Sequence, residues 1–386
     1  MPCKNVIFFD IISSAGSRKG IKRAVKGERK MSKLSIKMND QRLAFIGRVD
    51  FTDPLKPMFT WPGSSVELKA VAEKISVKIK NYRSCYHNYV GISVNGEDPK
   101  KTEITELKEE TEVVLIDGLD ATKESRITIY KPMDAAHFYE ISEIILEAKD
   151  EEAELLEKPE LPARRMEVFG DSVSAGEVSE AVEYVGKSDP EGHEGIYSNS
   201  WYGYTFMTAR KLGAQLYDEA QGGAALFDKT GWFHGPDFVG METIYNKLRF
   251  NDQIMPMTDW DFARYTPHVV VIAIGQNDAN PENYMGNDEE KSRKWKDGYK
   301  KFIETLREKY PKAQFILTTT ILNHSKEWDD AIDEVAKSFN DKKVQHFLYT
   351  NNGTGTPGHI RKPEAEVMSD ELSAFINSLG EEIWQD

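Results

Sequence analysis

The hydrophobic pattern of the chain changes near residue 160, and this change limits the possible folds more than any other feature. Before it, short runs either alternate between polar and apolar residues, as in 76–80, or are β-branched, as in 113–116. Turn residues such as Asn95-Gly96 separate these runs. Several short strands with no helical pattern between them predict an all-β jelly-roll sandwich over residues 41–148.

From Met166 onward, strand patterns and helical patterns alternate. Strands are expected at 166–169, 268–275, 315–320 and 344–349, and helices at 200–212, 291–310, 328–339 and 364–379. Residues 268–275 are apolar almost throughout, as in a parallel strand that is buried on both faces. The alternation predicts an α/β domain over 164–386, with a flavodoxin-like parallel sheet between two layers of helices.

Charge predicts the remaining boundaries. The first thirty residues carry eight basic side chains, whereas the whole chain has a net charge of −14. We expect residues 1–40 to be a basic tail that is disordered, or a non-native start with the true start at Met31, and a targeting peptide is the alternative. Residues 149–163 are charged and end in prolines, so they are expected to be a linker.

The same composition restricts the partners. A net charge of −14 argues against nucleic acid or an anionic membrane, because both bind basic surfaces, and leaves a neutral ligand such as a sugar open. No stretch of the sequence reaches the roughly 20 apolar residues of a membrane span, and no secretory signal is recognisable. Cys3 and Cys85 are expected to be free thiols. These features favour a cytoplasmic protein.

Polar segments follow two of the expected strands, and ligands of parallel sheets bind at such strand ends. Gly170-Asp171-Ser172 follows the first strand, where a serine would present its hydroxyl and its backbone N–H at the edge of the sheet. Alone, this tripeptide is better explained as a helix N-cap. Asn277 follows the long apolar strand and could donate its side-chain amide to an oxyanion, although alone it is better explained as part of an ordinary turn.

His359 lies on the segment just before the last expected helix, where a histidine can act as a general base. Alone, it is better explained as a surface or structural histidine. Together, the order of Ser172, Asn277 and His359 supplies a nucleophile, an oxyanion donor and a base, which is the set that acyl transfer needs.

With these residues the chain resembles the SGNH hydrolases, also called GDSL esterases. Their conserved blocks are Gly-Asp-Ser, a central Gly, Gly-x-Asn-Asp and a late His. The resemblance implies that Ser172 is the nucleophile and His359 the base, and that Ser172, Gly223 and Asn277 form the oxyanion hole. Gly222 aligns with the central block nearly as well as Gly223. The resemblance implies no cofactor, and the other histidines lack the spacing of metal ligands.

The N-terminal half narrows the resemblance. Gly47-Arg48, the run 59–64 (Phe-Thr-Trp-Pro-Gly-Ser) and the run 126–131 (Arg-Ile-Thr-Ile-Tyr-Lys) are similar to the jelly-roll domain of carbohydrate esterase family 2. That family implies a carbohydrate O-acetyl esterase that releases acetate from acetylated plant polysaccharides or oligosaccharides of xylan or mannan type. The alternatives are a GDSL lipase or thioesterase, and a carbohydrate-binding protein without catalysis.

The chain departs from the SGNH pattern at one position. Most members carry an aspartate three residues before the base histidine, and here that position is Thr356. We therefore expect a Ser172–His359 dyad in which a backbone carbonyl in 351–354, rather than an acidic side chain, holds Nδ1 of His359.

Neighbouring residues receive structural or substrate-binding interpretations. Asp171 and Asp278 are expected to fix the turns around Ser172 and Asn277. Residues 189–193, in a long insertion, are expected to form a rim of the cleft. Trp232 is expected either to stack on a sugar ring or to pack beneath its own loop.

Overall fold

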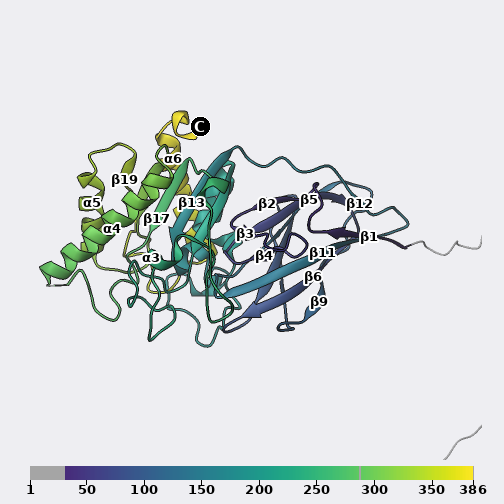
Figure 1. Ribbon diagram of the computed structural model, residues 1–386, viewed down its shortest axis with the longest axis horizontal. Helices are drawn as coiled ribbons and strands as arrows, with labels where there is room; N and C mark the ends of the chain where they lie inside the picture. The colour runs from purple at the N-terminus through teal and green to yellow at the C-terminus, as the bar shows by residue number, and fades with distance from the viewer. Residues whose placement is uncertain (1–30, 287, 386) are drawn as a thin grey trace, which may run out of the picture.

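The alternating segments of the N-terminal half form two antiparallel sheets of six strands each that face one another across an apolar core (Figure 1). The structure, a computed structural model, describes residues 31–286 and 288–385. In the first sheet, β3-β4-β11-β6-β9 are neighbours in this order and β1 pairs with β11. Its strands are β1 (Met31–Lys37), β3 (Val49–Asp50), β4 (Met58–Phe59), β6 (Lys74–Arg83), β9 (Glu110–Asp117) and β11 (His137–Lys149).

The second sheet has the order β12-β5-β10-β7-β8, with β2 paired to β5. Its strands are β2 (Ala44–Ile46), β5 (Ser65–Val71), β7 (Tyr89–Val94), β8 (Lys100–Glu103), β10 (Ser125–Tyr130) and β12 (Glu154–Leu155). Alternate residues of β6, namely Ile75, Val77 and Ile79, are buried in the core, as the period of two in this run predicts. The predicted jelly-roll sandwich is confirmed.

Two predicted boundaries of this domain are corrected. β1 lies within the predicted tail, because residues 31–37 pair along their whole length with β11; residues 1–30, with Cys3, lie outside the described residues. β12 lies within the predicted linker and pairs with β5. β1 lies off the main path of its sheet and β12 lies at the edge of its own. Both bury few side chains, so their sequences carry little apolar signal.

The C-terminal half contains a five-stranded parallel sheet of order β14-β13-β17-β18-β19, which confirms the predicted flavodoxin-like α/β fold. Its strands are β13 (Arg164–Gly170), β14 (Ala214–Ala220), β17 (Val269–Ala273), β18 (Gln314–Thr318) and β19 (Val344–His346). Within β17, Val269 and Val271 join the apolar cluster of one helical layer, and Val270 and Ile272 join that of the other.

Helices cover both faces of this sheet (Figure 1). One layer contains α2 (Tyr204–Leu212) and α6 (Lys362–Ser378), and the other contains α4 (Glu289–Lys309) and α5 (Lys326–Ser338). The shorter elements are α1 (Ser172–Ala175), α3 (Met241–Ile244), β15 (Lys247–Arg249), β16 (Thr258–Asp259), η1 (Val182–Tyr184), η2 (Ser200–Tyr202), η3 (Phe262–Arg264) and η4 (Glu381–Trp384). Among the described residues, none of the helices combines the length and apolar character that crossing a bilayer requires.

Two elements differ from the prediction. The expected helix 200–212 is divided, because Gly203 takes an extended conformation (φ −66°, ψ 143°) between η2 and α2. Strand β14 was not expected, because Asp218 and Glu219 make its sequence polar, although both side chains are buried.

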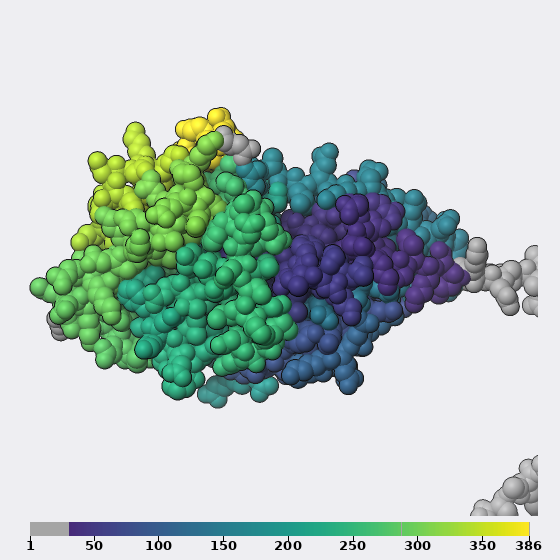
Figure 2. Space-filling view, in the orientation of Figure 1, coloured from purple at the N-terminus to yellow at the C-terminus, as the bar shows by residue number. Residues whose placement is uncertain are grey.

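Contacts between the two domains, which lie side by side in one continuous body (Figure 2), explain the burial of Glu219. Arg48 of the sandwich is fully buried and lies 2.9 Å from Glu167 and 3.0 Å from Glu219 of the C-terminal domain. The indole N–H of Trp61 donates to the carbonyl of Leu248 (3.0 Å), and Trp61 belongs to the same apolar cluster as α4 and α5. The domains therefore share a core.

Candidate active site

Ser172 lies where β13 ends, on a turn that Asp171 fixes. The carboxylate Oδ1 of Asp171 accepts a hydrogen bond from the backbone N–H of Val173 (3.0 Å), as a helix N-cap does, and Oδ2 accepts one from the side chain of Gln276 (2.8 Å). Both bonds hold the start of α1 against the end of β17. The expected structural role of Asp171 is thus confirmed, and Ser172 is 7% exposed.

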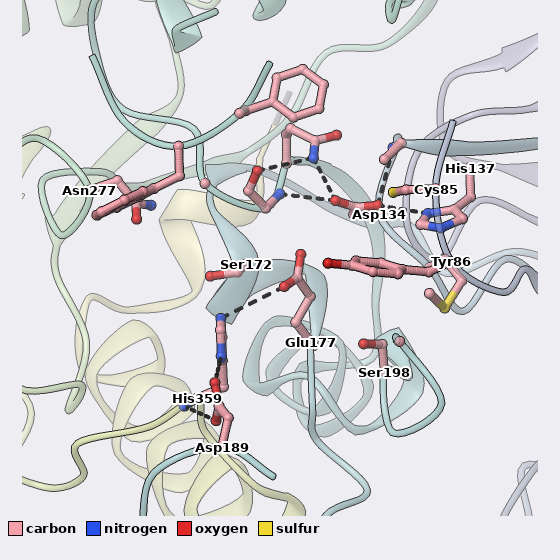
Figure 3. Close-up of a pocket in the computed structure, with 18 of the residues that line it drawn as sticks. Cys85, Tyr86, Asp134, His137, Ser172, Glu177, Asp189, Ser198, Asn277 and His359 are labelled. Atoms are coloured by element: carbon pink, nitrogen blue, oxygen red, sulfur yellow. Dashed lines mark hydrogen bonds and ion pairs between the residues drawn. The ribbon is translucent and has the colours of Figure 1, made fainter. Parts of the chain in front are cut away.

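One pocket of about 890 Å³ brings the predicted site residues together (Figure 3). Ser172, Gly223, Trp232, Asn277 and His359 all line it. The pocket lies between the two domains, because the sandwich supplies another part of its lining. These residues of the sandwich are Ser84, Cys85, Tyr86, Met133, Asp134, Ala136 and His137. The volume lies in the range of sites for small ligands.

The prediction that a backbone carbonyl orients His359 is wrong. Nδ1 of His359 lies 2.6 Å from the carboxylate Oδ2 of Asp189, and the backbone N–H of His359 donates to Oδ1 of the same residue (2.9 Å). Asp189 belongs to the insertion that was expected to form only a rim. Thr356 instead places its hydroxyl near the N–H of Gly358 (3.4 Å). An acidic third member is therefore present, supplied by a different segment.

Two residues near His359 explain how Asp189 reaches it. A Cβ atom on Gly358 would lie 2.5 Å from the carbonyl oxygen of Lys187 and 2.7 Å from Oδ1 of Asp189, so the insertion can approach this closely only at a glycine. Arg361 is fully buried and donates to Oδ1 of Asp189 (2.8 Å) and to the carbonyl oxygen of His359. Arg361 thus joins both partners.

The contact shifts the pKa of both groups. Burial alone would lower the pKa of His359, but the hydrogen bond and charge of Asp189 raise it overall. Burial likewise opposes ionisation of Asp189, but the hydrogen bond from His359 lowers the pKa of this carboxyl overall. The pair is therefore suited to a neutral imidazole that becomes a stabilised imidazolium.

A further carboxyl group faces the same imidazole. Oε2 of Glu177 lies 3.7 Å from Nε2 of His359, on the side opposite Asp189 (Figure 3). Burial, followed by the nearby charge of Asp134, raises the pKa of Glu177 to about 8. Glu177 was not predicted, because a glutamate five residues after the nucleophile has no pattern in sequence that marks it. At neutral pH this group is mostly uncharged, so it adds little negative charge to the pocket.

The predicted oxyanion donors differ in whether they already have a hydrogen-bond acceptor. Among the described residues, the backbone N–H groups of Ser172 and Gly223 have no acceptor, and both residues line the pocket. The N–H of Gly222, in contrast, donates to Asp134 (3.2 Å), which favours Gly223 as the donor. The side-chain amide of Asn277 donates to Asp171 (3.2 Å) and to the carbonyl of Ala224 (3.1 Å), so the oxyanion role of Asn277 stays a prediction.

Two other predictions concern Asp278 and Trp232. Asp278 accepts hydrogen bonds from the backbone N–H of Leu226 (2.9 Å) and from the indole of Trp295 (2.7 Å), which confirms its structural role. Trp232 is 64% exposed at the wall of the pocket, so the alternative that it packs beneath its own loop is wrong. Cys85 is a free, exposed thiol at the pocket, as expected.

Two family descriptions match the chain. Residues 45–159 match the family described as Carbohydrate esterase 2 N-terminal, and residues 168–346 match the GDSL-like Lipase/Acylhydrolase family. The second match contains Ser172, Gly223 and Asn277 and ends before His359.

Relatives with assigned activities have the same two halves. The chain is 27% identical over 353 residues to the cellulase/esterase CelE of Acetivibrio thermocellus, covering 88% of this chain but only 40% of CelE. It is 23% identical over 355 residues to an acetylxylan esterase / glucomannan deacetylase of Cellvibrio japonicus, covering 89% of this chain and 91% of the relative.

Solved structures agree with the fold. A family two carbohydrate esterase from Cellvibrio japonicus superposes with a TM-score of 0.72 at 22% identity, over 91% of this chain and 98% of the other. A family two carbohydrate esterase from Clostridium thermocellum in complex with cellohexaose gives a TM-score of 0.69 at 25% identity, over 89% and 100%. Both similarities extend across the two domains.

Proposed function

We propose that this chain, whose residues 45–159 match the N-terminal domain of carbohydrate esterase family 2 and whose residues 168–346 match a GDSL-type domain, is a carboxylic ester hydrolase. Its proposed reaction is the removal of O-acetyl groups from plant polysaccharides of xylan or mannan type, or from their oligosaccharides. The observation that carries the proposal is the 2.6 Å contact between Asp189 and His359 in the pocket that Ser172 lines. It supplies an oriented base beside a serine nucleophile.

In the proposed mechanism, Nε2 of His359 takes the proton from the hydroxyl of Ser172, whose oxygen attacks the acetyl carbonyl. The resulting oxyanion accepts hydrogen bonds from the N–H groups of Ser172 and Gly223, and from Asn277 once its amide releases Ala224. The imidazolium of His359 then protonates the departing sugar oxygen, which leaves as a hydroxyl group. Water, deprotonated by the same imidazole, releases acetate from Ser172, while Asp189 stabilises the imidazolium in both steps.

The lining of the pocket supports a neutral sugar as the substrate. It contains the carboxyl groups of Asp134, Glu177 and Asp189, and no lysine or arginine is among the described residues that line it. Such a wall disfavours acidic sugars, because like charges repel. The proposal of a carbohydrate-binding protein without catalysis was encouraged by the missing aspartate, and Asp189 removes that reason.

The test is acetate release from acetylated xylo-oligosaccharides and acetylated glucomannan by the wild type, Ser172→Ala and Ser174→Ala. Ser174 is the matched control, because it is buried on the same turn and bonds to Tyr204 (3.0 Å) without lining the pocket. We expect release by the wild type and by Ser174→Ala, and none above background by Ser172→Ala. Equal rates in the wild type and Ser172→Ala would exclude the serine mechanism, and rates on p-nitrophenyl esters that rise with acyl length would contradict the acetyl specificity.

A further inference from the structure

A loop of the N-terminal domain reaches into the active-site pocket and contacts the turn that carries Gly223. This loop, residues 131–136, joins β10 to β11. The ammonium group of Lys131 is fully buried and donates to the backbone carbonyls of Met133 and Asp134. These bonds fold the loop back on itself, so the position of Asp134 is determined within its own domain.

The carboxylate of Asp134 divides its hydrogen bonds between the two domains. Oδ1 accepts from the backbone N–H of Ala136 (3.1 Å) and from Nδ1 of His137 (3.0 Å), both in the sandwich. Oδ2 accepts from the side-chain amide of Gln221 (2.5 Å) and from the backbone N–H of Gly222 (3.2 Å), both in the C-terminal domain (Figure 3). Burial opposes ionisation, but the hydrogen bond and charge of His137 and the charge of Lys131 lower the pKa of Asp134 overall, so it accepts as a carboxylate.

The contact with Asp134 fixes Gln221 and Gly222, and a separate backbone bond fixes Gly223. The carbonyl of Gly223 accepts from the backbone N–H of Trp232 (2.8 Å), and the N–H of Ala224 donates to the carbonyl of Gln221 (3.1 Å). Gly223 itself has a φ of 76°, which few residues other than glycine adopt. Its N–H, which has no acceptor among the described residues, lies between these fixed points.

We propose that Asp134 is a positioning residue of the oxyanion hole: it holds the turn 221–223 so that the N–H of Gly223 meets the oxyanion. The N-terminal domain would then contribute to transition-state stabilisation and not only to substrate binding. The inference rests on the proposed function, because it takes the N–H of Gly223 as an oxyanion donor. Such donors act at distances of about 2.7–3.1 Å, and loss of one lowers kcat by about 10²–10³-fold, so a displaced turn has a measurable effect.

The experiment compares Asp134→Asn with Asp50→Asn on p-nitrophenyl acetate, a substrate too small to depend on glycan contacts. Asp50 is the matched control: it is 3% exposed, accepts two bonds from Thr52 with one oxygen, and accepts one bond from Arg249 of the other domain with the second (3.0 Å). It lies outside the pocket. Both variants therefore remove one buried charge from a contact between the domains, and only one of them touches the turn.

We expect Asp134→Asn to lower kcat about 10 to 100-fold with KM within about twofold, because asparagine has one acceptor oxygen for two sets of donors. The affinity for methylboronic acid, which forms a tetrahedral adduct with a serine nucleophile, should fall by a similar factor. Asp50→Asn should retain kcat within about twofold. If Asp134→Asn does not fold, Gln221→Ala, which removes one of the two bonds to the turn, should lower kcat in the same way.

Three results would overturn the inference: wild-type kcat in Asp134→Asn, an equal loss of kcat in Asp50→Asn, or a change in KM alone. Each leaves the proposed function intact, since that function fails only if the wild type releases no acetate or if Ser172→Ala remains active.

Discussion

The carboxylate of Asp189 and the imidazole of His359 lie 2.6 Å apart although 170 residues separate them in the chain. Asp189 therefore takes the place that an aspartate three residues before the histidine would occupy. The base is oriented by an insertion between α1 and α2, whose position depends on Gly358 and Arg361.

Asp189→Asn should lower kcat for acetate release by about 10²–10⁴-fold, because asparagine cannot stabilise the imidazolium and favours the wrong tautomer. Thr356→Val is the control: Thr356 occupies the position three before His359 but makes no contact with its ring, so this variant should stay close to wild type. Steady-state kinetics, together with a thermal melt to show that both variants fold, decide the question. Wild-type kcat in Asp189→Asn would remove Asp189 from the mechanism.

The acid limb of the pH profile should report His359. Catalysis needs the neutral imidazole, and Asp189 raises the pKa of His359 above its ordinary value of 6.5. kcat/KM should therefore fall as the pH drops through a pKa above 6.5. In Asp189→Asn the midpoint should move to lower pH, because the favourable charge is lost. An unchanged midpoint in this variant would contradict the assignment of the limb.

Glu177→Gln should alter the alkaline side of the pH profile of kcat/KM. With a pKa of about 8, Glu177 becomes negatively charged above that pH, and this charge in the pocket, 3.7 Å from Nε2 of His359, opposes the developing oxyanion. Wild-type kcat/KM should decline above pH 8, whereas glutamine, which mimics the protonated acid, should keep the plateau. An identical decline in both proteins would show that another group titrates.

The stability of Glu177→Gln relative to the wild type should also depend on pH. Because the folded pKa of about 8 exceeds the ordinary value of 4.5, the folded protein binds the proton more tightly. This stabilisation is present below pH 4.5 and lost as the pH rises to 8. The melting temperature of the wild type relative to Glu177→Gln should therefore decrease across that range. A constant difference would mean that the burial of Glu177 does not affect folding.

Arg48→Met should destabilise the whole chain. Removing the guanidinium leaves Glu167 and Glu219 buried without their cation, and breaking a buried ion pair in this way costs about 3–5 kcal/mol. Urea denaturation should show a lower midpoint, partly restored by adding Glu167→Gln and Glu219→Gln. The control is Lys123→Met, whose partner Asp120 lies on the surface and whose loss should not be measurable. Equal midpoints for Arg48→Met and Lys123→Met would contradict the role of Arg48.

Trp232→Ala should separate sugar binding from chemistry. We expect KM for acetylated oligosaccharides to rise about tenfold, as truncation of an exposed aromatic contact does, with kcat on p-nitrophenyl acetate unchanged. Leu348→Ala, an exposed apolar residue outside the pocket, controls for loss of surface area. Unchanged KM in Trp232→Ala would remove the tryptophan from the binding site.

The fold and the central residues of the site could be predicted from the sequence because both depend on local signals. The runs around β6 and β17 report their burial through their periods of apolar residues, and Ser172, Asn277 and His359 stand in short motifs. Asp189, Glu177 and Asp134 could not be found in this way. Each acquires its role from a contact with a distant segment, and a single acidic residue in a loop carries no sign of its partner. Strand β14 was missed for a related reason, because one of its carboxylates, Glu219, is buried against an arginine of the other domain.

The core that joins the two domains restricts how the molecule can be rearranged. Trp61 and Phe138 of the sandwich pack in one cluster with Phe250 and with side chains of α4 and α5, so cutting the chain in the connecting segment would expose apolar surface on both pieces. The sandwich is therefore not an independent module that can be fused to an unrelated catalytic domain. Recombination between related enzymes would succeed only where the two exchanged domains have complementary interface residues. A substitution on one side of the interface would need a compensating substitution on the other side.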